Sequence, residues 1–82
     1  GNCSMSFDFV IDLHGIPSIQ EALELLEREL YRAWKLKIRE GRIVHGIGEG
    51  KMAEAVHEVL KKNPIIRSWQ EDESGGSCII FF

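Results

Sequence analysis

The sequence predicts a two-layer α/β sandwich in which two helices cover a mixed four-stranded sheet, in the order β-α-β-α-β-β. Two apolar segments are each followed by a glycine turn and then by apolar residues at helical spacing. Two further apolar segments are separated only by a short polar turn, which is typical of a hairpin. Because strands joined by a helix normally run parallel, we expect three parallel strands and a fourth that returns antiparallel.

The composition is that of one small globular domain. The chain has 82 residues, of which 44% are hydrophobic and 28% are charged. No apolar run approaches the roughly 20 residues of a membrane-spanning helix, and no secretory signal is recognisable. Cys3 and Cys78 lack the spacing of a disulfide framework or a zinc motif. We therefore expect a reducing, cytoplasmic location and no membrane partner.

The first residues divide into a tail and a strand. Residues 1–6 are polar and small and are expected to be a tail or linker remnant, with the domain spanning residues 7–82. Because the chain begins with Gly rather than Met, we expect a domain cut from a longer protein. Residues 7–13 are predicted to form the first strand, and their continuous apolar run predicts burial on both faces.

The first helix is predicted from its capping residues and its apolar spacing. Ser18 and Glu21 match a capping box, and Gly41 offers a left-handed end, so the helix should run to about residue 40. The residues at helical spacing that form its buried stripe are Ile19, Leu23, Leu26, Leu30, Ala33 and Trp34.

The second helix follows the second glycine turn and should end at Asn63-Pro64. His57 lies off the apolar stripe of this helix and is expected to face solvent. The other strands are predicted over residues 42–45, 65–70 and 78–82, with residues 71–76 forming the turn of the hairpin.

Polar residues follow the first two strands where each strand ends. Asp12 and His14 come at the end of the first strand and His45 at the end of the second. Parallel strands bring these ends to the same edge of the sheet, about 5 Å apart if the strands are neighbours. Ligands bind at this edge in open α/β sheets, so we interpret the two turns as one site.

Each of these side chains also has a simpler interpretation. Asp12 could cap its own turn, and His14 and His45 could be hydrogen-bonded turn histidines. Together the three suit general acid–base catalysis, since imidazole transfers protons near neutral pH and a carboxylate can fix its tautomer. A metal ion held by Asp12, His14 and His45 is chemically possible as well.

The glycines of the second turn suit an anion. Gly46, Gly48 and Gly50 allow the backbone to approach a ligand closely, and free N–H groups at the start of the following helix favour a phosphate. The alternative is a tight strand-to-helix turn that simply requires glycine. The hairpin turn with Gly75 and Gly76 is expected to reach the same edge.

The motifs Asp12-Leu13-His14-Gly15 and His45-Gly46-Ile47-Gly48-Glu49-Gly50, in this order, resemble those of the small MutS-related (Smr) domain. The resemblance extends from Phe9 to Phe82. It implies a fold similar to the C-terminal domain of translation initiation factor 3.

The resemblance also implies an endonuclease that nicks DNA or cleaves RNA. It assigns catalysis to Asp12, His14 and His45. The residues expected to contact phosphate are Gly46, Gly48, Gly50, Lys51, Gly75 and Gly76.

Two features depart from the family pattern. Met52-Ala53 stands where the family often has Leu-Arg, and Lys51 is the remaining cation there. The net charge is −3, and the site edge is expected to carry acidic residues, which repel phosphates or hold a divalent ion: Glu21, Glu49, Glu71, Asp72 and Glu73. Six of the ten positive charges are expected toward the opposite edge: Arg28, Arg32, Lys35, Lys37, Arg39 and Arg42.

We therefore expect weak, salt-dependent binding of DNA or RNA by the isolated domain, with other domains of the parent protein supplying most of the affinity. A non-catalytic nucleic-acid-binding module and a protein-interaction module are the alternatives to a nuclease.

Overall fold

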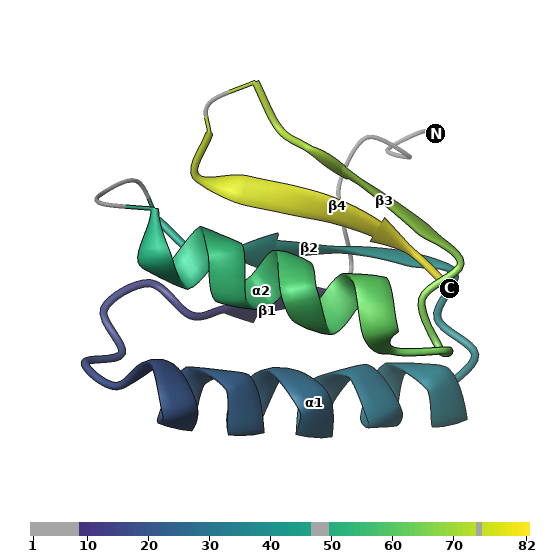
Figure 1. The fold of residues 1–82 in the computed structure, drawn as a ribbon. Helices are drawn as coiled ribbons and strands as arrows, with labels where there is room; N and C mark the ends of the chain where they lie inside the picture. Colours follow the sequence, from purple (N-terminus) through teal and green to yellow (C-terminus); the bar gives the residue numbers. More distant parts are fainter. Residues whose placement is uncertain (1–8, 47–49, 74) are drawn as a thin grey trace.

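The computed structural model describes residues 9–46, 50–73 and 75–82. The elements are β1 (Val10–Asp12), α1 (Ile19–Lys35), β2 (Glu40–Val44), α2 (Lys51–Lys62), β3 (Ser68–Glu71) and β4 (Ser77–Phe81). They form a four-stranded sheet of order β1-β2-β4-β3 (Figure 1). β1 and β2 are parallel, and β4 is antiparallel to both β2 and β3. The predicted element order and mixed sheet are confirmed, while the predicted tail lies outside the described residues.

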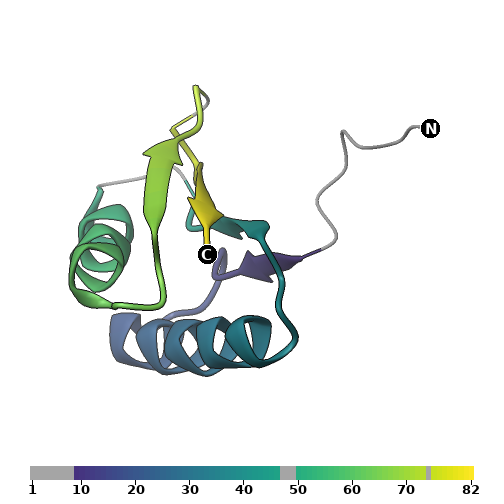
Figure 2. The same ribbon diagram turned by 90° about the vertical axis from the view of Figure 1, so that its right-hand side faces the viewer.

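The molecule has two layers, with both helices on one face of the sheet (Figures 1 and 2). The core lies between these layers, as apolar side chains alternate inward along the strands and recur along the helices. Its buried residues are Phe9, Ile11, Leu13, Ala22, Leu26, Leu30, Ala33, Ile43, Val56, Leu60, Cys78 and Ile80. Within the described residues, no helix is both long and apolar enough to cross a membrane.

The first strand is buried on one face only, contrary to the prediction. Ile11 is buried, whereas Val10 and Asp12 on either side of it are exposed. Both helices lie on the same side of the sheet, so the other face of β1 has no covering layer among the described residues. Leu13 extends the pairing beyond the strand, because its N–H donates to Val44 O at 2.7 Å.

The first helix begins where predicted and ends earlier. Ser18 caps it, with its Oγ accepting the Glu21 N–H at 3.3 Å. The helix ends at Lys35, because Lys37 adopts a left-handed φ of 62°. The Lys37 N–H donates to Trp34 O, and the Ile38 N–H donates to Ala33 O, which is the hydrogen-bond pattern of a Schellman motif.

Gly41, predicted as the helix end, lies inside β2. A Cβ at this position would come within 2.9 Å of Phe9 O and of Phe9 Cδ2. Glycine is therefore required for the close approach of two chain segments rather than for a helix cap.

The buried stripe of α1 is narrower than predicted. Ala22, Leu26, Leu30 and Ala33 are buried, whereas Ile19 is 37% exposed and Trp34 is 55% exposed. Ala33 occupies the centre of the stripe in the last turns, which leaves Trp34 on its flank, in contact with Tyr31 at 6.0 Å between ring centroids.

The second helix ends at Lys62 with Asn63 as its C-cap, as predicted. The third strand starts three residues later than expected. Asn63 Oδ1 accepts the Ile65 N–H, and Asn63 O accepts the Ile66 N–H, so a turn continues through Ile66 before β3 begins at Ser68.

Candidate functional site

Three turns meet at one edge of the sheet. They follow β1, follow β2 and connect β3 to β4, and they lie on the same side of the molecule (Figure 1). Backbone hydrogen bonds join two of them, since the N–H groups of His45 and Gly46 both donate to Gly76 O, at 3.0 and 2.9 Å. The parallel pairing of β1 with β2 brings the first turn beside the second, with Asp12 opposite Val44. The topology therefore gathers the residues that the sequence suggested as one site.

His14 lies against the backbone of the glycine turn. A Cβ on Gly46 would be 3.2 Å from His14 Cδ2, and Gly46 has a φ of +85°. Both facts favour glycine here, because a side chain would crowd the imidazole and strain the backbone. The His14 side chain is exposed. It is therefore an imidazole presented to solvent directly beside Gly46.

Asp12 supports the turn that carries His14. Its Oδ1 accepts the backbone N–H of His14 at 2.9 Å, which is an Asx-type turn. The carboxylate thus acts on the backbone of His14. It is exposed at the end of β1, two residues before His14 in the sequence.

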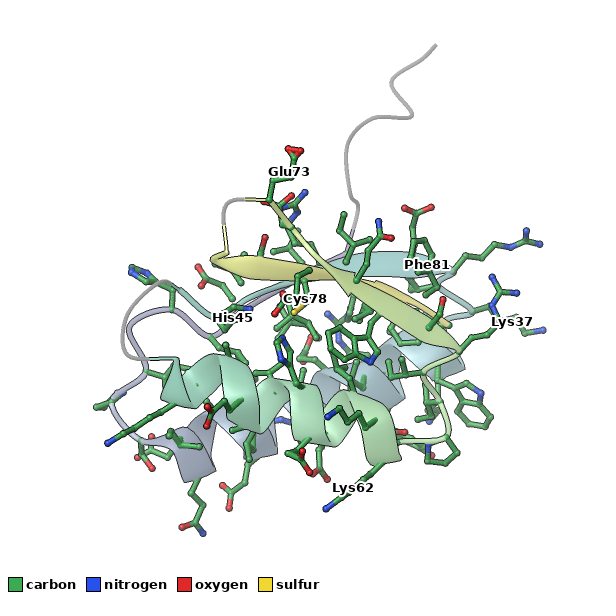
Figure 3. The ribbon with its side chains drawn as sticks, turned by 45° about the horizontal axis from the view of Figure 1, so that its top comes forward. Lys37, His45, Lys62, Glu73, Cys78 and Phe81 are labelled. Atoms are coloured by element: carbon green, nitrogen blue, oxygen red, sulfur yellow. The ribbon has the colours of Figure 1, made fainter. Side chains whose placement is uncertain are left out.

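His45 points the opposite way, into the protein. It continues the inward alternation of Gly41 and Ile43 along β2 and is only 7% exposed. Its Nδ1 lies 3.0 Å from Gly46 O, a carbonyl that can only accept, so Nδ1 carries the proton. Its Nε2 faces Cys78 Sγ at 3.5 Å on the helix-covered side of the sheet (Figure 3).

Cys78 is a free, fully buried cysteine on β4. Burial, together with the nearby Glu71 carboxylate, raises the pKa of its thiol to about 11. The sulfur is therefore protonated near neutral pH, and its S–H can donate to His45 Nε2. The sequence pointed to no role for this cysteine, because its spacing matches neither a disulfide framework nor a zinc motif.

His57 was predicted to face solvent, and this prediction is wrong. Its side chain is 19% exposed, its ring stacks on Trp69 at 4.6 Å, and it lies edge-on to His45 at 6.0 Å between centroids. The sheet extends past β4 to β3, so the flank of α2 that carries His57 packs on β3 instead of facing water. The available signal was that His57 precedes the buried Leu60 by three residues, one helical turn.

The start of α2 forms the third part of the edge. Gly50 is the N-cap with a φ of +89°, and as a glycine it has no side chain to cap the helix. Lys51 is the first residue of α2, where free N–H groups and the helix dipole favour an anion. Gly75 in the hairpin turn also has a positive φ, of +79°. Gly48, predicted to contact phosphate, lies outside the described residues.

Arg42 reaches the site edge, although the sequence placed it among the cations of the opposite edge. Its Nη1 donates to Ser77 Oγ at 2.8 Å and lies 3.8 Å from Asp72 Oδ2. Ser77 is the residue directly after the Gly75–Gly76 turn. Two of the predicted acidic residues are thus turned to other partners, since Asp72 lies near Arg42 and Glu71 lies near His57.

Among the described residues, one group of side chains has donor atoms close enough together to hold a metal ion. It consists of His45, His57 and Cys78, each with a donor atom within 4.8 Å of the others. It differs from the set of Asp12, His14 and His45 that the sequence suggested, because His45 turns inward while His14 stays outside.

The fold and this edge define a small α/β domain whose glycine turns collect at the carboxyl ends of two parallel strands, a place where such sheets bind ligands. Residues 11–81 match the family model described as the Smr domain. The chain belongs to the Smr domain family.

Relatives and a solved structure agree with this assignment. The chain is 38% identical over 60 residues to Endonuclease MutS2 of Thermomicrobium roseum, and 38% identical over 72 residues to Endonuclease MutS2 of Agathobacter rectalis. These matches cover 73% and 88% of this chain but only 7% and 9% of the relatives. The crystal structure of the Smr domain of Thermus thermophilus MutS2 superposes with a TM-score of 0.82 at 26% identity, covering 89% of this chain and 95% of that chain.

Proposed function

We propose that this domain is an endonuclease that cleaves phosphodiester bonds at the edge formed by the three turns. The observation that carries the proposal is the exposed imidazole of His14 against the backbone of Gly46, close in the chain to the start of α2. The imidazole provides a proton-transfer group, and the N–H groups at the start of α2 provide an anion site. The relatives named Endonuclease MutS2 support the same activity.

In this proposal each of the suggested catalytic residues has a distinct role. His14 takes a proton from the nucleophile, which is water or, on RNA, the 2′-hydroxyl. Asp12 holds the turn that carries His14 through the hydrogen bond to its backbone N–H. His45 acts from inside by holding the Gly46 carbonyl, and it is a positioning residue.

The phosphate would lie on the glycine turns and the start of α2. N–H groups at the start of α2 would stabilise charge on the phosphoryl oxygens, and Lys51 adds a positive charge. Gly46 and Gly75, whose N–H groups donate to Gly76 O and Asp72 O, would instead allow the phosphate to approach the backbone closely. The proposed contacts are Gly46, Gly48, Gly50, Lys51, Gly75 and Gly76. Arg42 adds a further cation on the hairpin side of the edge.

A second candidate is a nucleic-acid-binding module without catalysis. The inward orientation of His45 favours it, because both ring nitrogens already have neighbours inside the protein. The use of Asp12 as a turn cap favours it as well. In both candidates the nucleic acid lies at the same edge, and other domains of a longer protein contribute affinity.

Cleavage assays with His14→Gln separate the candidates. Supercoiled plasmid and end-labelled structured RNA are incubated with wild type and His14→Gln, with and without EDTA. We expect wild type to cleave and His14→Gln to be slower by about 10²–10⁴-fold, the usual contribution of a general acid or base. Glutamine keeps polarity and size at an exposed position, so the fold should be unaffected.

Glu24→Gln, on the exposed face of α1, is the matched control and should retain wild-type activity. Equal cleavage by wild type and His14→Gln would contradict the assignment of His14. No cleavage by any of the proteins, together with retained binding, would favour the module without catalysis.

A further inference from the structure

We propose that His45, His57 and Cys78 form a binding site for a zinc-class divalent metal ion on the helix-covered side of the sheet. The site lies behind the glycine edge, with ligands from the end of β2, from α2 and from β4. The proposal is independent of nuclease activity.

The spacing of the donor atoms fits a tetrahedral ion. His45 Nε2 and Cys78 Sγ are 3.5 Å apart, and the donor atoms of all three residues lie within 4.8 Å of one another. With a metal–nitrogen distance of about 2.0–2.1 Å and a metal–sulfur distance of about 2.3 Å, tetrahedral angles place nitrogen and sulfur roughly 3.5 Å apart. His45 and Cys78 therefore already have the separation of two ligands on one ion.

The protonation of His45 suits a ligand. Its Nδ1 lies 3.0 Å from Gly46 O and donates to it, which leaves the lone pair of Nε2 directed toward the sulfur. Metal-binding histidines almost always donate their other ring N–H to a carbonyl or carboxylate, which fixes the tautomer and the ring orientation. The Gly46 carbonyl already fulfils this role.

A second observation at this cluster concerns the ring of His57. Its Nε2 is buried and has no hydrogen-bond partner among the described residues. Glu71 Oε1 lies 3.2 Å away, and this contact is an ion pair only when the ring is protonated. A buried polar atom without a hydrogen bond is costly, whereas a metal ion bound by the neutral ring would satisfy Nε2. Trp69 stacks on the ring and limits its rotation.

The donor set selects the class of ion. A thiolate with two imidazoles suits borderline ions such as Zn²⁺ and Co²⁺, while Mg²⁺ and Ca²⁺ prefer oxygen ligands. A water molecule would complete the four ligands, as in zinc sites with three protein ligands. Glu71, whose side chain is 62% exposed, lies beside His57 at the solvent side of the cluster. Binding would release the Cys78 proton to solvent, since the thiolate is the ligand.

The test is titration of metal-free protein, without any histidine tag, with Co²⁺ in the Trp34→Phe background. Bound Co²⁺ should give thiolate charge-transfer absorption and the visible bands of tetrahedral cobalt at a ratio of one ion per chain. It should also quench Trp69, the remaining tryptophan, which stacks on His57. Zn²⁺ should displace Co²⁺, remove the bands and raise the melting temperature.

Cys78→Ser should lose the thiolate absorption, and Cys3→Ser is the matched control that should keep it. Because Cys78 is fully buried, His57→Gln provides a second variant at a half-buried position, and it should weaken Co²⁺ binding at least 10-fold. Circular dichroism checks that each variant is folded.

Three results would overturn the proposal. They are the absence of cobalt bands in the folded wild type, bands of equal strength in Cys78→Ser, and loss of the bands in Cys3→Ser. In that case Cys78 and His45 interact only through an S–H hydrogen bond, without a metal ion. None of these readouts depends on cleavage, so failure of the metal site and failure of the proposed nuclease are distinguishable.

Discussion

At Gly41 the absence of a side chain lets β2 pass close to the backbone of Phe9. A Cβ there would lie 2.9 Å from Phe9 O and from Phe9 Cδ2. The Arg42 N–H donates to this same Phe9 O at 3.0 Å, so the carbonyl cannot move away without losing a strand hydrogen bond. A methyl group at residue 41 would therefore force the backbone of β2 or of Phe9 to move.

Gly41→Ala is accordingly expected to lower the free energy of unfolding by about 1–3 kcal/mol, the usual effect of overpacking a core. Urea denaturation followed by circular dichroism measures it. Gly15→Ala is the comparison, because a Cβ there meets nothing within 4 Å and only the φ of +86° is unfavourable. Equal, small effects of the two substitutions would mean that the strands separate easily at Gly41.

At the scale of elements, the end of α1 depends on a residue type that rarely accepts the required conformation. Lys37 has a φ of 62°, and the Schellman hydrogen bonds from Lys37 and Ile38 form only with this backbone. A left-handed conformation costs a residue with a Cβ about 1 kcal/mol relative to glycine. The turn therefore forms although lysine disfavours the left-handed conformation, because Ile38 packs against the core.

Lys37→Gly should raise the free energy of unfolding by about 0.5–1 kcal/mol and increase the melting temperature by a few degrees. Differential scanning calorimetry measures the change. Lys35→Gly, two residues earlier, is the matched control with the same change of composition. It should destabilise by up to about 1 kcal/mol, because residue 35 is the last residue of the helix and glycine has a lower helix propensity than lysine. A destabilising Lys37→Gly would contradict the importance of the left-handed turn.

Most elements could be predicted because their signals are local. Ser18 marks the start of α1 and Asn63 the end of α2, since capping is decided within one helical turn. The end of α1 could not be found in this way. Glycine was taken as the helix end, but the close contact of Gly41 with Phe9 is made across 32 residues of chain, and no local pattern records it.

At the scale of the molecule, topology predicted that the turns would meet, and the backbone bonds to Gly76 O agree. The direction of each side chain was beyond the sequence. His14 and His45 both follow strands, yet the first is exposed and the second is buried beside Cys78. The place of His57 was also not predictable, because it depends on β3 lying beyond β4 in the sheet. The buried polar cluster is thus a property of the assembled sheet.

Each end of the molecule carries a lysine, so the contribution of each end to nucleic-acid binding can be measured separately. Lys51 starts α2 at the glycine edge, whereas Lys35 ends α1 at the other end of the molecule. Lys37 marks this second end in Figure 3, on the far side from His45. With a net charge of −3, binding should be weak and should rest on a few phosphate contacts at one end.

Fluorescence anisotropy of labelled single-stranded DNA and RNA, repeated at several salt concentrations, gives the dissociation constant and its salt dependence. These values identify the end of the molecule at which the nucleic acid binds. Each phosphate contact changes the slope of log K against log salt by about 0.7–0.9. Lys51→Gln should weaken binding and reduce the slope by about this amount, because it removes one contact at the glycine edge. Lys35→Gln, the same substitution at the opposite end, should leave the slope unchanged. The reverse pattern would place the nucleic acid along α1, beside the exposed rings of Tyr31 and Trp34, and would separate binding from the proposed catalytic edge.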